Sequence, residues 1–200
     1  MISFQDNIRA FERGLSDLAR RQLPFATSQA LNDTAFDVKD AWETLFDKRL
    51  DKPTPFTKRG VFIRRSTKSK LVAEVGIKDI QAGYLKTLVA GGERTPSGRA
   101  ILIPVGQKLN KYGNMPKGSV ARALSRKDTF SGRVKGVAGV WKRPTKSKRK
   151  SSGPVLLVAY ADRADYDQQL DLDHVAAARA RARFPIHFEK RFMAAMQTAR

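Results

Sequence analysis

The sequence predicts an α+β fold, with long N-terminal helices and a C-terminal helix packed on a small central antiparallel β-sheet with long basic loops. Helical patterns occupy both ends of the chain, whereas short apolar runs bounded by turn residues occupy its middle. This order of helices, strands and helices favours α+β over an alternating α/β arrangement. We expect a single domain over residues 1–200, with N-terminal helices (1–50), a β-rich basic core (56–160) and a C-terminal helical segment (168–200).

The first fifty residues predict two amphipathic helices. Ser3 suits an N-cap, and apolar residues follow it at helical spacing. We expect a second helix from Pro24 to about Arg49, because a proline in the first turn lacks only an N–H that has no partner there. Five carboxylates lie off its apolar face: Asp33, Asp37, Asp40, Glu43 and Asp47. We interpret them as a solvated face, and the alternative is that they meet the basic region of a neighbouring subunit.

The middle of the chain predicts strands and two short helices. Alternation and turn residues indicate strands at Val61–Arg65, Leu71–Val75, Ala100–Val105 (buried), Gly139–Lys142 and Pro154–Tyr160, the last two as a hairpin. Short helices are expected at Ile80–Val89, before Gly91 and Gly92, and at Ser119–Ser125 within a loop-rich segment, 106–135. The C-terminal helical pattern runs over Leu170–Arg183 to Pro185 and resumes from Phe188.

Charge is concentrated in one part of the chain. Between Arg94 and Ala161 there are sixteen lysines and arginines and one acid, Asp128, so this stretch carries +15 of the formal +20. Such an excess repels itself unless an anion lies nearby, and a nucleic-acid backbone, an acidic protein or an anionic membrane would supply one. The basic residues fall in loops and short strands, which predicts backbone contacts without sequence reading.

Twelve cations are the candidate anion contacts, although a solvated surface position is the alternative for each. The first group surrounds a basic loop at 143–153: Lys142, Arg143, Lys146, Lys148, Arg149 and Lys150. The second group precedes it: Lys111, Lys117, Arg126, Lys127, Arg133 and Lys135.

Residues suited to catalysis or metal binding are few. There is no cysteine, and His174 and His187 are unpaired in sequence, so we expect surface or partly buried helix histidines rather than a zinc site. Five aspartates lie between Asp162 and Asp173, where helix capping competes with a metal-dependent nuclease site. We predict no enzyme, no cofactor and no metal, and the nuclease is kept as a third hypothesis.

We expect a soluble protein made in the cytoplasm. The N-terminus carries charges where a signal peptide needs an apolar run. The longest apolar stretch, Val155–Ala161, is far shorter than the roughly 20 residues that cross a bilayer.

Three stretches resemble phage minor tail protein Z and the related tail-completion (neck) proteins of long-tailed phages. The first is Leu23–Ala26 with Ala30–Ala35. The second joins Tyr84-Leu85, Val89–Arg94 and Ile103–Val105 to Tyr112–Lys117 and Leu124-Ser125. The third is Phe184-Pro185 with Phe188 and Ala194-Ala195. Within the second, Tyr112-Gly113-Asn114-Met115-Pro116-Lys117 is the most distinctive piece. Together the resemblance covers most of residues 20–200, while the loop at 143–153 is more basic than the family pattern requires.

The resemblance implies a structural virion protein made in the bacterial host cytoplasm. Such proteins form a homo-oligomeric ring, expected to be sixfold, at the head-proximal end of the tail, in the neck of the virion. Its partners would be the head–tail connector, the tail terminator or tail tube proteins and the genomic DNA in the lumen, with no membrane. The alternative hypothesis is a sequence-nonspecific DNA-binding protein that acts outside the virion.

Overall fold

The computed structural model describes the backbone of residues 4–144 and 153–198, and the side chains of 21–144 and 153–197. Its helices and small antiparallel sheets confirm the α+β class. The chain forms two compact units: a helical unit (Met1–Arg49, Pro55–Tyr84, Leu170–Arg200) and a sheet unit (Leu50–Thr54, Leu85–Gln169). The assignment of one domain stays a prediction.

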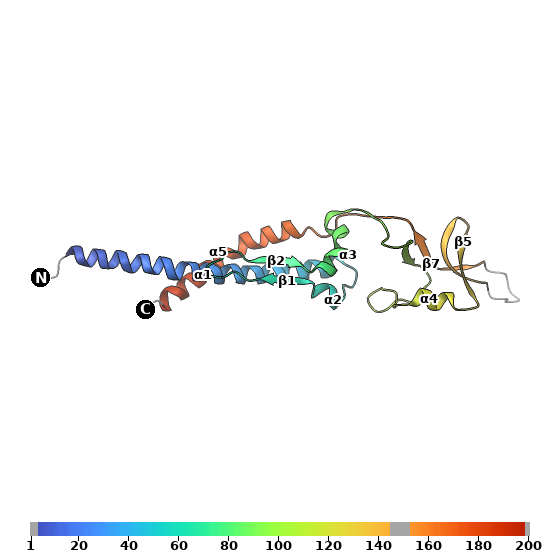
Figure 1. The fold of residues 1–200 in the computed structure, drawn as a ribbon, viewed down its shortest axis with the longest axis horizontal. Helices are drawn as coiled ribbons and strands as arrows, with labels where there is room; N and C mark the ends of the chain where they lie inside the picture. The colour runs from blue at the N-terminus through green and yellow to red at the C-terminus, as the bar shows by residue number, and fades with distance from the viewer. Residues whose placement is uncertain (1–3, 145–152, 199–200) are drawn as a thin grey trace. The chain divides into compact units, whose positions relative to one another are not determined.

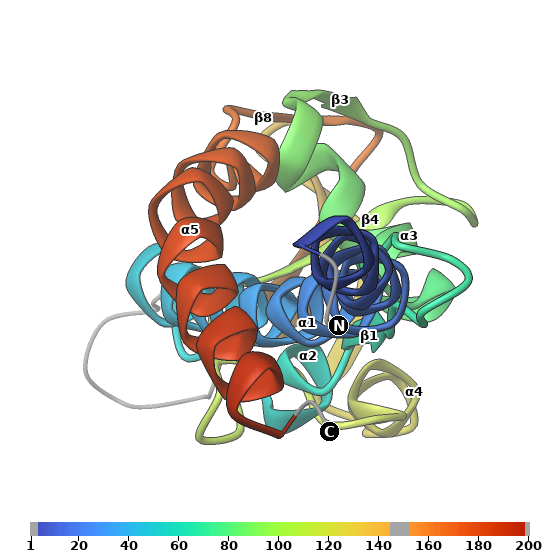
Figure 2. The same cartoon turned by 90° about the vertical axis from the view of Figure 1, so that its left-hand side faces the viewer.

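Most of the helical unit consists of two helices. Its elements are α1 (Phe4–Arg49), α2 (Pro55–Lys58), β1 (Val61–Arg64), β2 (Glu74–Ile77), the start of α3 (Asp79–Ala90) and α5 (Leu172–Thr198). Helices α1 and α5 lie side by side and run antiparallel (Figures 1 and 2), since Asp33 contacts Arg191 whereas Trp42 contacts Leu172. The alanines Ala26 and Ala30 of α1 are fully buried.

The prediction that a second helix begins at Pro24 was wrong, because α1 continues through this residue. Helix α5 likewise continues through Pro185, where we expected the pattern to be interrupted. A proline inside a helix removes one backbone hydrogen bond. Tertiary packing of the buried stripe outweighs this local cost in both helices, as it often outweighs intrinsic propensity.

The solvated-face interpretation of the α1 carboxylates was wrong for Asp33 and Asp37. Both are half-buried and bind basic side chains of α5 in the same chain. Glu43 and Asp47 form pairs with Lys39 and Lys58, at 3.4 and 2.6 Å.

A two-stranded sheet lies against α1. Strands β1 and β2 pair antiparallel, with Val61 opposite Ile77, and both contact α1. The side chain of Asn32 donates to the carbonyl of Ser66 (3.1 Å) and accepts from its N–H (2.7 Å), which ties the segment after β1 to the helix. The strand predicted at Val61–Arg65 is confirmed as β1, whereas the second strand begins at Glu74 rather than Leu71.

Within the sheet unit, four strands pair antiparallel in the order β4-β7-β6-β5. These strands are β4 (Ile101–Pro104), β5 (Thr129–Val134), β6 (Val137–Lys142) and β7 (Val155–Ala161). A separate pair joins β3 (Gly92–Arg94) to β8 (Ala164–Tyr166), and the short helix α4 (Ser119–Leu124) packs near the four-stranded sheet. The core gathers Ala123 of α4 with Val140, Leu157 and Val158 of the sheet.

Several predicted elements of the sheet unit are confirmed, namely β4, α4 and the β6–β7 hairpin. The expectation of a buried strand at Ala100–Val105 was wrong, because β4 is an edge strand whose Leu102 is 43% exposed. Strand β5 lies in the segment that we expected to be loop and helix, and it turns into β6 through Lys135 and Gly136, which both have positive φ. Among the described residues, no helix is long and apolar enough to span a membrane.

Candidate anion-binding surface

Eight of the twelve predicted contact residues lie in the described part of the sheet unit, on different elements. Lys142 and Arg143 stand at the end of β6, and Arg133 and Lys135 at the end of β5 and in the turn after it. Lys111 and Lys117 precede α4, while Arg126 and Lys127 follow it. Lys146, Lys148, Arg149 and Lys150 lie outside the described residues.

The carboxylate of Asp128 brings two of these cations together, and its backbone contacts that of a third. Arg126 donates to both of its carboxylate oxygens, at 2.9 and 2.7 Å, and the ammonium of Lys142 lies 3.9 Å from Oδ2. The backbone N–H of Arg143 donates to the carbonyl of Asp128 at 2.7 Å. The hydrogen bonds from Arg126 hold the pKa of the Asp128 carboxyl below its ordinary value, so this acid is charged at neutral pH. One carboxylate therefore contacts two cations and balances only one of them.

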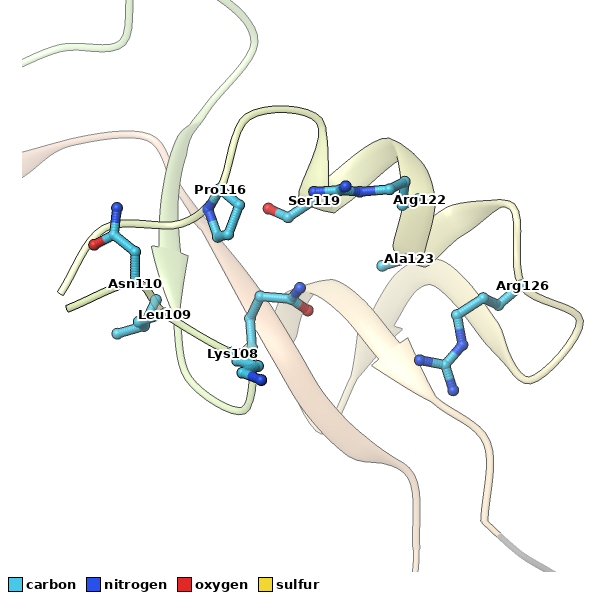
Figure 3. A pocket seen from close by; sticks show the side chains of 9 residues that line it. Lys108, Leu109, Asn110, Pro116, Ser119, Arg122, Ala123 and Arg126 are labelled. Atoms are coloured by element: carbon cyan, nitrogen blue, oxygen red, sulfur yellow. The ribbon is translucent and has the colours of Figure 1, made fainter. Parts of the chain in front are cut away.

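A second group of cations surrounds a pocket beside α4 (Figure 3). The pocket has a volume of about 440 Å³ and carries the basic side chains of Lys108, Arg122 and Arg126. Its remaining lining comes from Gln107, Leu109, Asn110, Pro116, Ser119 and Ala123.

A compact turn shapes one side of this pocket. The side-chain oxygen of Asn110 accepts from the N–H groups of Tyr112 (2.9 Å) and Asn114 (3.0 Å), and the N–H of Asn110 donates to the carbonyl of Asn114. This is the standard use of asparagine to close a turn on itself. The guanidinium of Arg122 donates to the carbonyl of Lys117 at 3.1 Å, which joins α4 to the segment after the turn. Of the stretch Tyr112–Lys117, Pro116 thus lines the basic pocket.

Lys108 and Arg122 were not among the candidate contacts that the sequence identified. Their only sequence signal is membership of the basic stretch, since they lie fourteen residues apart on a loop and a helix. Arg126 is the one predicted contact that reaches the pocket.

The remaining predicted cations are not gathered at one point. Lys111 lies over the ring of Tyr112 (5.0 Å to its centroid) and Arg143 over that of Phe130 (also 5.0 Å), both cation–π contacts. Arg133 lines a different hollow, over the sheet, and Lys127 is exposed. The arrangement suits an anion with many charges spread over a surface, such as a phosphate backbone or an acidic protein.

The histidines occupy α5, as expected for helix residues. His174 is exposed, and His187 is partly buried with its Nε2 2.8 Å from Oδ2 of Asp37. Asp171 caps α5 by accepting a hydrogen bond from the N–H of His174 at 3.1 Å, which confirms capping for this member of the aspartate cluster. Within residues 4–144 and 153–198, no group of three or more histidines, cysteines or acids is placed to hold a metal ion.

Compared with known proteins, the chain matches no family model, no curated protein and no solved structure.

Proposed function

We propose that this chain is a structural protein of the phage head–tail junction, a tail-completion or neck protein without catalytic activity. It assembles as a ring at the head-proximal end of the tail, with basic surfaces facing DNA or acidic neighbours. The observation that carries the proposal is the set of cations around Asp128 and in the pocket beside α4, with a single acid among them. The resemblance of Tyr112–Lys117 and its flanking stretches to tail-completion proteins is the reason for proposing the head–tail junction as the location.

Ring assembly would explain the concentration of positive charge in this part of the chain. One heterologous interface repeated by rotation closes a ring, and it repeats every basic surface around the axis. Cations repeated in this way would form a positive collar, which a DNA backbone passing through the lumen neutralises. In the free chain the same cations repel one another, so we expect the surface to favour anionic surroundings.

Particle composition tests the proposal. The chain should co-purify with virions and be located between the head and the tail when the particles are imaged. A phage whose gene for this chain carries a stop codon should yield heads and tails that do not join, and supplying the chain in trans should restore joining. Complete, infectious particles that lack the chain would refute the neck assignment.

The second candidate is a sequence-nonspecific DNA-binding protein that acts outside the virion. The pocket of Lys108, Arg122 and Arg126 favours it, because one chain alone supplies all three cations. A free binder should hold duplex DNA tightly as a monomer or dimer, and log K should fall against log salt with a slope of about −0.9 per phosphate contact. A neck protein instead binds weakly alone and forms rings, which analytical ultracentrifugation detects. The nuclease hypothesis predicts magnesium-dependent cleavage of plasmid, and intact plasmid removes it.

A further inference from the structure

A second hollow lies over one face of the four-stranded sheet, separate from the basic pocket. Its volume is about 910 Å³. The register explains its floor: Leu102 of β4 lies opposite Tyr160 of β7, and Ala138 of β6 lies opposite Arg133 of β5. Because residues opposite one another point to the same side, each of these pairs presents its side chains on one face. Leu124 of α4 also lines the hollow.

The lining contains exposed apolar side chains that this unit leaves uncovered. Leu102, Leu124 and Val137 are 43%, 40% and 42% exposed. The hydroxyl of Tyr160 lies 3.3 Å from that of Ser131, so this polar group is satisfied while the ring contributes apolar surface. Apolar surface gathered in a concave site, unlike single exposed residues, marks a place where a partner docks.

The lining of the hollow also carries charge. Arg99 and Arg133 line it, with Asp162 as the one acid. Both arginines are exposed, and neither forms an ion pair with an acid of the described chain. Apart from Asp162, the lining belongs to the +15 stretch, so its field also favours a negatively charged occupant.

The apolar side chains and the arginines of the hollow together favour one kind of binding partner over others. A phosphate backbone satisfies the arginines but leaves the leucines and the valine exposed, whereas a purely apolar segment leaves the arginines unused. A second copy of the sheet unit would bring another set of like charges to this surface. A segment with both carboxylates and aliphatic side chains pairs with the arginines and covers the apolar side chains together.

We propose that this hollow binds an acidic, apolar segment of a partner protein. Aliphatic side chains of the segment cover Leu102, Leu124 and Val137, and its carboxylates pair with Arg99 and Arg133. The inference goes beyond the proposed function, since it requires neither a virion nor a ring.

Fluorescence anisotropy on the full-length protein tests the inference. The probe is a labelled peptide of alternating leucine and aspartate, compared with the same peptide carrying lysine for aspartate and with one carrying serine for leucine. The leucine–aspartate peptide should bind, and the other two should bind much more weakly. Failure of this peptide to bind, or equal binding of the lysine version, would overturn the proposal.

Three variants locate the binding site. Arg133→Glu should weaken binding by roughly fivefold, as expected for loss of an exposed ion pair with added repulsion. Leu102→Asp should weaken it by roughly tenfold through lost apolar burial. The matched control is Lys86→Glu, which makes the same charge change at an exposed position outside the hollow and should alter affinity by less than about twofold.

Circular dichroism establishes that each variant is folded, and Arg133→Glu changes only an exposed side chain. Equal weakening by Lys86→Glu and Arg133→Glu would assign the binding to overall charge and reject the hollow. Unlabelled duplex DNA provides the last comparison. If DNA displaces the peptide and also loses affinity on both Arg133→Glu and Leu102→Asp, the hollow is a nucleic-acid site and the proposal fails.

Discussion

Arg191 of α5 donates hydrogen bonds to both carboxylate oxygens of Asp33 in α1, with Nε to Oδ2 at 2.6 Å and Nη2 to Oδ1 at 2.9 Å. One turn further along α1, Oδ2 of Asp37 accepts from Nε of Arg183 (2.6 Å) and lies 2.8 Å from Nε2 of His187. Arg183 and His187 stand on either side of Pro185, so Asp37 holds both parts of α5 where the proline removes a backbone bond. These contacts fix the register of the two antiparallel helices.

Replacing Arg191 by alanine should lower the free energy of unfolding by about 1 kcal/mol. This value is the upper end for exposed ion pairs. It is no larger because the side chains of Arg191 and Asp33 are 40% and 26% exposed, so solvent screens their attraction. Arg191→Lys should lose about half as much, since lysine keeps the charge but not the two-pronged geometry. Urea unfolding followed by circular dichroism measures both.

The matched comparison is Lys39→Ala, which removes the pair between Lys39 and Glu43 at 3.4 Å on α1. A pair four residues apart on one helix contributes about 0.3–0.5 kcal/mol, so this variant should cost less than Arg191→Ala. An equal or larger loss from Lys39→Ala would mean that the pair between the two helices is no stronger than a surface pair within one helix.

Acid should weaken the α1–α5 pairing. The hydrogen bond from Arg191 lowers the pKa of Asp33 from 3.8. Burial alone would raise the pKa of Asp37, but the hydrogen bonds from Arg183 and His187 outweigh it and the net pKa is lowered. Both carboxyls therefore have a lower pKa in the folded chain than in the unfolded chain. Their stabilisation is present above the unfolded value and is lost as the pH falls through the folded one.

Thermal melting against pH measures this effect. The contribution of the two carboxyls should be constant above about pH 5 and should decline below about pH 4. The double variant Asp33→Asn/Asp37→Asn should be less stable at neutral pH and show a shallower decline in acid. A decline equal to that of the parent chain would place the acid-sensitive groups elsewhere.

Local signals were enough to predict much of the fold. Helix α3 ends at Ala90 because Gly91 follows with a φ of 71°, a conformation that glycine adopts without strain. The β6–β7 hairpin follows from two runs of apolar residues around a polar segment. In each case the deciding residues are neighbours in sequence.

The errors arose where distant residues decide. Pro24 and Pro185 are strong local reasons to end a helix, yet the buried contacts between α1 and α5 keep both helices continuous. Nothing in the acidic pattern of α1 identifies α5 as its partner 150 residues later, as in the pair of Asp37 and His187. Charge density likewise predicted a basic surface, but the meeting of Lys108 and Arg122 in one pocket depends on how α4 packs.

Gly132 and Gly139 lie opposite each other in the β5–β6 pair, and alanine should have different effects at the two positions. A Cβ at Gly139 would overlap the backbone carbonyl oxygen of Val158 on β7, which cannot move without breaking the sheet. A Cβ at Gly132 meets only the ring of Phe130, at an ordinary 3.5 Å. Gly139→Ala should therefore cost about 2–3 kcal/mol of unfolding free energy, as overpacking does.

Gly132→Ala is the control, and it should be neutral or stabilising by up to about 0.5–1 kcal/mol, because glycine is the less favourable residue inside a strand. Urea unfolding of the two variants measures the difference. Equal stabilities would show that β6 and β7 do not approach as closely at Gly139 as the structure places them.

Neutralising the one acid in the basic stretch should strengthen its binding to DNA. Asp128 now engages Arg126 and Lys142, and Asp128→Asn removes its negative charge while keeping a side chain of similar shape. The two cations then become available to phosphates, and each added contact should steepen the slope of log K against log salt by about 0.9. Anisotropy with a labelled duplex over a salt series measures this, with Glu93→Gln as a control in which a carboxylate near Arg163 is neutralised outside the stretch. If both variants raise the affinity equally, net charge alone governs binding; if Asp128→Asn leaves both affinity and slope unchanged, Arg126 and Lys142 do not face the DNA.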